Sequence, residues 1–65
     1  MQISLNGKPS EVSAGRLDRV LEELGYQGAK VATALNGSFV PRPARGATEL
    51  REGDALEVIA PMQGG

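Results

Sequence analysis

Met1-Gln2-Ile3-Ser4-Leu5-Asn6-Gly7 combines a strand pattern with a hairpin signal, and the remaining segments can be placed around it. Apolar and polar side chains alternate along it, a period of two that puts one face of a strand on a core and the other in water. Asn6-Gly7 then accepts the positive φ angles of a two-residue type I′ turn. The stretch predicts a β-hairpin whose second strand returns from Pro9 to Val12 at a sheet edge, where the missing proline N–H costs little.

The hydrophobic period changes after this hairpin. Apolar residues now recur at i, i+3, i+4 and i+7, the stripe of an amphipathic α-helix: Leu17, Val20, Leu21 and Leu24. Ser13 is an N-cap candidate, and Gly25 has the position of a left-handed residue that ends the helix. On the solvent side, Arg19 and Glu23 have the i, i+4 spacing of an ion pair. So short a helix does not persist alone, and we expect its stripe to pack across the sheet.

A second strand-and-turn unit follows the helix. Residues 30–35 are mostly β-branched or small apolar residues, and Asn36-Gly37 repeats the hairpin signal. Ala32 and Ala34 are small enough to face the helix closely, with Val31, Thr33 and Leu35 on the other side. Both faces are nearly apolar, however, so the register of this strand stays open.

The last strand completes the pattern. Phe39 and Val40 return briefly, and Pro41-Arg42-Pro43 ends that return. Residues 44–49 have little pattern, Leu50 is expected to cover the core, and residues 51–54 read as a turn. Residues 55–60 form the final strand, with one face made by Leu56 and Val58 and the other by Glu57 and Ile59. Ile59 is therefore a candidate exposed apolar residue.

The chain closes with Pro61-Met62-Gln63-Gly64-Gly65. Proline ends a strand because it has no N–H to donate. Two glycines remove every Cβ from the last peptide units, which leaves a backbone narrow enough for a channel and a carboxylate that no side chain shields. Glycine-ended termini are also common and often without function, and 9 of the 65 residues are glycine, so the dipeptide alone does not establish a role.

The order of elements is hairpin, helix, strand, short strand, loop and strand. If the apolar first and last strands pair in parallel at the centre, the helix covers one face of the sheet. This is the β-grasp, or ubiquitin-like, fold: an α+β class with a mixed four- to five-stranded sheet and one helix packed across it. We expect the β-grasp domain to span residues 1–60 and a flexible C-terminal diglycine tail to span residues 61–65.

Composition excludes several classes of function. A chain of 65 residues makes one domain near the lower size limit for a core. It has no cysteine and no histidine, so it has no thiol nucleophile, no disulfide and no usual general base, and an autonomous enzyme is not expected. A net charge of -1 and two aromatic residues argue against nucleic acid. No stretch is long and apolar enough to span a bilayer, so a cytoplasmic protein is expected.

Four segments together carry a family resemblance: Met1-Gln2-Ile3 with Leu5-Asn6-Gly7; residues 31–37 followed by Phe39-Val40-Pro41-Arg42; the Leu50-x-x-Gly53-Asp54 turn with Leu56-Glu57; and Met62-Gln63-Gly64-Gly65. In this order and length they resemble ThiS, the thiamine-biosynthesis sulfur carrier family, over essentially the whole chain. The segment Ala14-Gly15-Arg16 is the least typical part, and it concerns a helix cap rather than the chemistry.

The resemblance implies a protein substrate and sulfur carrier, not an enzyme. In this family an E1-like adenylating enzyme uses ATP and magnesium to convert the terminal carboxylate, here that of Gly65, into an acyl-adenylate. A sulfur donor such as a cysteine desulfurase persulfide then replaces AMP, and the resulting thiocarboxylate supplies sulfur to thiazole synthase. No cofactor is expected on the carrier itself. The lack of cysteine fits, because the sulfur would reside on the Gly65 carbonyl carbon.

Such chemistry requires the end of the chain to enter a closed site on the partner. Residues 61–65 span up to about 17 Å when extended, and we expect Gly64 to thread the channel. Arg42, Ile59 and Met62 are candidates for docking on the partner enzymes. In the alternative, Arg42 is a solvated loop charge and Met62 a flexible apolar residue.

Other functions share these features. The small subunit of molybdopterin synthase and carriers of cysteine or siderophore pathways have a similar ending, and a ubiquitin-like modifier would form isopeptides with target lysines. A structural β-grasp module with an inert tail is a further alternative. The sequence does not name the sulfur acceptor or donor, and it does not settle the oligomeric state.

Overall fold

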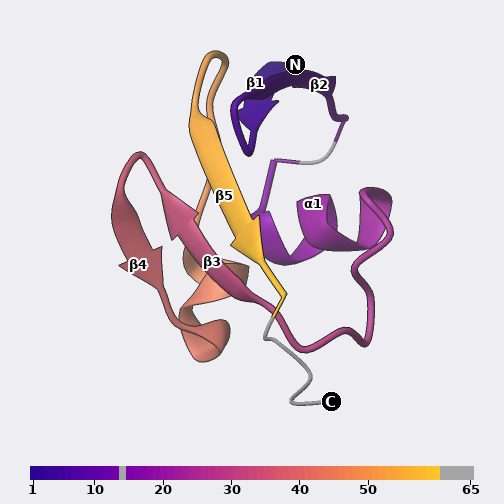
Figure 1. Cartoon of the computed structure of the whole chain (residues 1–65), viewed down its shortest axis with the longest axis vertical. Helices are drawn as coiled ribbons and strands as arrows, with labels where there is room; N and C mark the ends of the chain where they lie inside the picture. Colours follow the sequence, from indigo (N-terminus) through magenta and orange to yellow (C-terminus); the bar gives the residue numbers. More distant parts are fainter. Residues whose placement is uncertain (14, 61–65) are drawn as a thin grey trace.

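The computed structural model describes residues 1–13 and 15–60 and contains five strands, one α-helix and one 3₁₀ helix (Figure 1). In chain order these are β1 (Gln2–Leu5), β2 (Lys8–Glu11), α1 (Leu17–Glu23), β3 (Ala32–Leu35), β4 (Ser38–Val40), η1 (Arg42–Ala47) and β5 (Ala55–Ile59). The expected domain boundary at residue 60 stays a prediction, because residues 61–65 lie outside the described residues.

The strands form one mixed sheet in the order β2-β1-β5-β3-β4. β1 and β5 pair in parallel at the centre, with Ser4 opposite Ala55, and the other neighbours pair antiparallel. α1 lies beside the sheet (Figure 1). The sequence predicted a β-grasp fold because the first and last strands of the chain are apolar, and this fold is confirmed.

Both Asn-Gly dipeptides form the tight hairpin turns that the sequence predicts. Asn6 and Asn36 have φ angles of 50° and 51°, and each following glycine, Gly7 and Gly37, has φ of 85°. These are the positive angles of a type I′ turn, which asparagine and glycine tolerate better than other residues. The turns fix the registers of the β1–β2 and β3–β4 hairpins.

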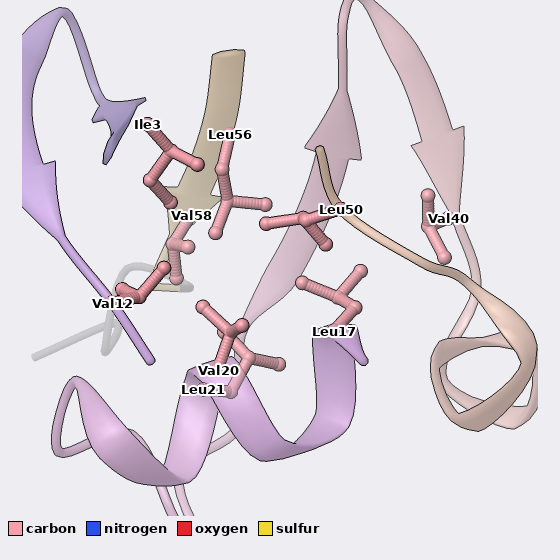
Figure 2. Close-up of a cluster of buried hydrophobic side chains, with 9 residues drawn as sticks. All are labelled: Ile3, Val12, Leu17, Val20, Leu21, Val40, Leu50, Leu56 and Val58. Carbon is pink, nitrogen blue, oxygen red and sulfur yellow. The ribbon is translucent and has the colours of Figure 1, made fainter. Parts of the chain in front are cut away.

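The core lies between α1 and one face of the sheet. Figure 2 shows Leu17, Val20 and Leu21 of the helix pointing toward Ile3 and Leu56 of the central strands. Leu50 reaches between the helix and the sheet, as expected for a residue that covers the core, and is 4% exposed. The buried apolar set is completed by Val12, Val40 and Val58.

The helix begins differently from the prediction. Its N-cap is Arg16, with no side-chain cap hydrogen bond, so the assignment of Ser13 as N-cap is wrong. The Ser13 hydroxyl and N–H instead donate to the Glu23 carboxylate, at 2.9 Å each to Oε2, which links the incoming segment to the far end of the helix. Glu23 is thereby drawn toward Ser13, and Arg19 pairs with Glu22 at 4.0 Å instead of with Glu23.

The structure settles which face of β3 meets the core: the face of Thr33 is buried, and the face of Ala32 and Ala34 is turned away from the helix. Thr33 is buried at 1% exposure, whereas Ala32 is exposed. The Thr33 hydroxyl donates to the Val40 carbonyl at 2.8 Å and accepts from Arg45 Nε at 3.2 Å, so its burial leaves no polar atom unpaired. These partners come from β4 and η1, and neither is visible in the local pattern of β3.

Residues 42–47, in a region with little sequence pattern, form the 3₁₀ helix η1. Pro41 is extended, with φ of -67° and ψ of 154°, and Pro43 occupies the first turn, where its missing N–H would have no partner in any case. The Thr48 hydroxyl donates to the Ala44 carbonyl at 2.7 Å and closes the far end. The prolines therefore end β4 as predicted and also start this helix.

Candidate functional site

β5 leads the chain toward its last residues from the middle of the sheet. It lies between β1 and β3, ends at Ile59 opposite Ala32 of β3, and is followed by the exposed Ala60. Three of the predicted site residues, Met62, Gly64 and Gly65, lie outside the described residues. Modification at Gly65, threading by Gly64 and docking by Met62 therefore stay predictions.

The Asn6 side chain holds the end of β5 on its β1 side. The Asn36 N–H donates to the Ala55 carbonyl across the antiparallel β3–β5 ladder, so the backbone groups of residues 55, 57 and 59 face β3. The backbone N–H and carbonyl of Val58 therefore face β1. β1 has already turned away at Asn6. The Asn6 amide replaces the missing peptide group: the Val58 N–H donates to Oδ1 at 2.9 Å, and Nδ2 donates to the Val58 carbonyl at 3.1 Å.

The outer face of the sheet exposes two large apolar side chains, Phe39 at 69% and Ile59 at 64%. The register places Ala34 opposite Phe39 and Ala32 opposite Ile59. The alternate residues of these strands, Thr33, Val40 and Val58, are buried toward the core. The predicted exposure of Ile59 is confirmed. The sequence reasoning did not single out Phe39, although its alternation with the apolar Val40 carried the signal.

Arg42 and Ile59, predicted separately, line the same open hollow of about 390 Å³. We call it the β5-end hollow. Its other lining residues are Ala29, Lys30, Val31, Ala32 and Arg45. The structure thus brings two of the three predicted docking residues together and adds Lys30 and Arg45, which the sequence reasoning did not select.

The cations of the hollow differ in how they are held. The Arg45 guanidinium donates to the Val31 carbonyl at 2.6 Å and to the Thr33 hydroxyl at 3.2 Å, which fixes it in the wall. Lys30 and Arg42 are exposed, and their side chains have no hydrogen bond or ion pair to any residue among 1–13 and 15–60.

Carboxylates near Arg42 are already engaged. Asp18 and Glu22 line a neighbouring hollow that Arg42 also borders, but Asp18 accepts from Arg16 at 2.8 Å and 3.0 Å, and Glu22 pairs with Arg19. The hydrogen bonds from the Arg16 guanidinium lower the pKa of Asp18 below its ordinary value, and the same contact raises the pKa of Arg16. Asp18 and Glu22 therefore do not neutralise Arg42 directly.

The described residues contain no group of three or more His, Cys, Asp or Glu side chains placed to hold a metal ion. In the same part of the chain, no helix has the length and apolar character needed to cross a membrane.

The fold and the site define a ubiquitin-like β-grasp protein whose central strand leads toward C-terminal glycines. Residues 3–65 match the model of the ThiS family. The chain is 45% identical over 67 residues to the sulfur carrier protein ThiS of Thermus thermophilus, covering 94% of this chain and 95% of the relative. The crystal structure of the thiamine biosynthesis protein ThiS from Geobacter metallireducens matches with a TM-score of 0.84 and 36% identity, and each chain is covered completely.

A longer relative carries a similar segment. The thiazole synthase of Magnetococcus marinus is 41% identical over 66 residues, which cover all of this chain but only 20% of the length of that enzyme. From the family match and the Thermus relative, this chain belongs to the ThiS family.

Proposed function

We propose that this chain is a sulfur carrier for thiamine biosynthesis and that it carries sulfur as a thiocarboxylate on Gly65. The observation that supports this best is the extent of the family match, which runs through residue 65 and so includes the diglycine ending. The role requires no catalytic side chain on the carrier, in agreement with a chain that has no cysteine and no histidine.

The chemistry follows from the poor reactivity of a carboxylate. A carboxylate oxygen is a poor leaving group, so the Gly65 carboxylate first attacks the α-phosphorus of ATP in an E1-like enzyme that holds magnesium, and pyrophosphate leaves. The terminal sulfur of a donor persulfide then attacks the acyl carbon, and AMP leaves. A thiol of the partner enzyme attacks the S–S bond of the resulting acyl persulfide, which releases the thiocarboxylate and leaves a disulfide on the partner. ATP and magnesium belong to the partner in this scheme, and the carrier binds no cofactor.

Thiazole synthase is the proposed acceptor of the sulfur. The support is a protein of that name in which a segment resembling this chain occupies one part of a longer polypeptide, since fusion often joins proteins that act together. The carrier then acts as a protein substrate of two enzymes, one that activates Gly65 and one that takes the sulfur from it.

The docking roles proposed for Arg42, Ile59 and Met62 fit this function. Arg42 and Ile59 share the β5-end hollow, next to the position from which residues 60–65 continue. Phe39 extends the apolar surface across β3 to β4. An enzyme that binds this surface would have its active site close to the end of the chain.

Intact mass spectrometry of the protein isolated from its own host without added thiols tests the proposal. We expect an oxygen-to-sulfur mass increase that fragmentation places on Gly65. If the mass is unmodified, ATP–pyrophosphate exchange with the activating enzyme of the host is measured next. Absence of both would refute the carrier function, and an isopeptide-linked ladder with target proteins would instead identify a modifier.

A further inference from the structure

The β5-end hollow gathers charges that have no partner among residues 1–13 and 15–60. Of the seven lysine and arginine residues, Arg16, Arg19 and Arg45 have partners within the described structure. The other four, Lys8, Lys30, Arg42 and Arg51, have none among the described residues, and two of these four line this one hollow. In a chain with a net charge of -1, this is a local concentration of positive charge.

The hollow is also apolar and prearranged. Ile59 is 64% exposed at its border, and Ala29, Val31 and Ala32 contribute small or apolar surface. Arg45 is fixed by bonds to the Val31 carbonyl and the Thr33 hydroxyl, so one wall needs no ordering when a partner binds. A positively charged hollow beside an exposed apolar side chain fits an acidic residue that is followed or preceded by an apolar one.

The position of the hollow limits its use to proteins that work on the end of the chain. Gly65 lies five residues beyond Ala60, and five residues span at most about 17 Å. An enzyme that reacts with Gly65 must therefore present its active site close to the end of β5. Its surface meets the border of the hollow formed by Ile59, the last residue of β5.

We propose that the β5-end hollow binds a carboxylate of the enzyme that activates Gly65, through Lys30 and Arg42, while an apolar side chain next to that carboxylate covers Ile59. This inference rests on the proposed function. It identifies the kind of surface that the activating enzyme would present, a segment with an acidic residue next to an apolar one. The pairing steers the encounter and fixes its orientation, and it takes no part in the bond changes at Gly65.

Charge reversal tests the assignment. In adenylation assays with the activating enzyme, Arg42→Glu should raise KM for the carrier about tenfold or more and leave kcat within about twofold, because the lost contact serves binding and not the chemical step. The matched control is Arg51→Glu, an exposed arginine in the turn that precedes the opposite end of β5. It should change KM by less than about twofold.

The difference in KM between the two variants should become smaller at high salt, which screens exposed charges. Unfolding curves verify that both variants fold.

Carbodiimide cross-linking identifies the carboxylate directly, since it joins an amine to a carboxylate without a spacer. The chain has two lysines, Lys30 in the hollow and Lys8 on β2 at the far edge of the sheet. We expect Lys30 to link to an aspartate or glutamate of the activating enzyme and Lys8 not to link.

The outcomes separate this inference from the function on which it rests. Adenylation of the wild type with equal KM for the Arg42 and Arg51 variants would overturn the docking assignment alone. A link from Lys30 to a carboxylate of the same chain, or of a second copy, would also overturn it. Absence of adenylation of the wild type, together with no sulfur on Gly65 of the protein isolated from its host, would overturn the proposed function and this inference with it.

Discussion

Asn6→Asp is expected to loosen the end of β5 without disturbing the hairpin turn. Aspartate tolerates the positive φ of 50° at this position almost as well as asparagine, so the backbone is not strained anew. The carboxylate still accepts from the Val58 N–H, but it has no N–H to donate, and one oxygen is placed where Nδ2 now lies 3.1 Å from the Val58 carbonyl oxygen. A hydrogen bond becomes a contact between two acceptors.

The size of the effect follows from those two atoms. A hydrogen bond contributes about 0.5 to 1.5 kcal/mol net, and leaving a partly buried carbonyl unpaired costs about 1 to 3 kcal/mol. The retained bond to the Val58 N–H becomes charge-assisted and offsets part of that loss. We expect a net destabilisation of about 1 to 2 kcal/mol, a substantial share of the roughly 3 to 10 kcal/mol typical of a domain this small.

Urea unfolding and amide hydrogen exchange measure this prediction. The free energy of unfolding should fall by the stated amount, and the exchange protection of the β5 amides near residue 58 should fall with it. In acid the new carboxyl is protonated and can donate to the Val58 carbonyl. The difference in unfolding free energy between Asn6→Asp and wild type should therefore become smaller. The control Asn6→Gly removes both bonds while keeping the turn conformation, and it should be destabilised independently of pH. An unchanged unfolding free energy in both variants would refute the idea that the Asn6 amide holds β5.

Three further changes test the core, the ion pair and the end of the chain. Leu56→Ala empties a fully buried position and should cost about 2 to 5 kcal/mol in urea unfolding; a loss below about 1 kcal/mol would show that the site is not tightly packed. The pKa of Asp18 is lowered by Arg16, so its stabilisation is present above the unfolded pKa and disappears as the pH falls through the folded one. Asp18→Asn should thus be less stable than wild type at neutral pH and equal to it in strong acid, and a constant difference would contradict the ion pair. Gly64→Val should fold normally yet fail adenylation, and normal activation would argue against a narrow channel in the partner.

The fold could be predicted because its local signals agree with each other. The alternation of residues 1–6, the two Asn-Gly turns and the helical stripe each specify one element, and the central position of the first and last strands follows from their apolar character. The facing of β3 could not be predicted in this way. Thr33 points inward because it bonds to Val40 and Arg45, residues 7 and 12 positions away, and no pattern within the strand reports those partners.

The candidate site was predicted in pieces. Ile59 follows from alternation along β5, and Arg42 follows from the segment it shares with the family. Their meeting in one hollow depends on the hydrogen bonds from Arg45 of η1 to Thr33 and to the Val31 carbonyl, which composition and periodicity do not specify. Lys30 enters the hollow only because β3 begins two residues after it, and in the sequence it looks like an ordinary connector lysine.

The pairing register of β5 with its neighbours affects both the stability of the sheet and the proposed function. Leu56 and Val58 point into the core, while Glu57 and Ile59 point outward. A slip by one residue would bury Ile59 and expose the core residues, because side chains alternate with a period of two. It would also move the root of residues 61–65 by about 3.3 Å. The pairing of β5 with β3 on one side and with Asn6 on the other opposes such a slip at the end nearest the glycines. The same hydrogen bonds that stabilise the sheet therefore keep Ile59 exposed on the outer face and, under the proposed function, set how far Gly65 can reach.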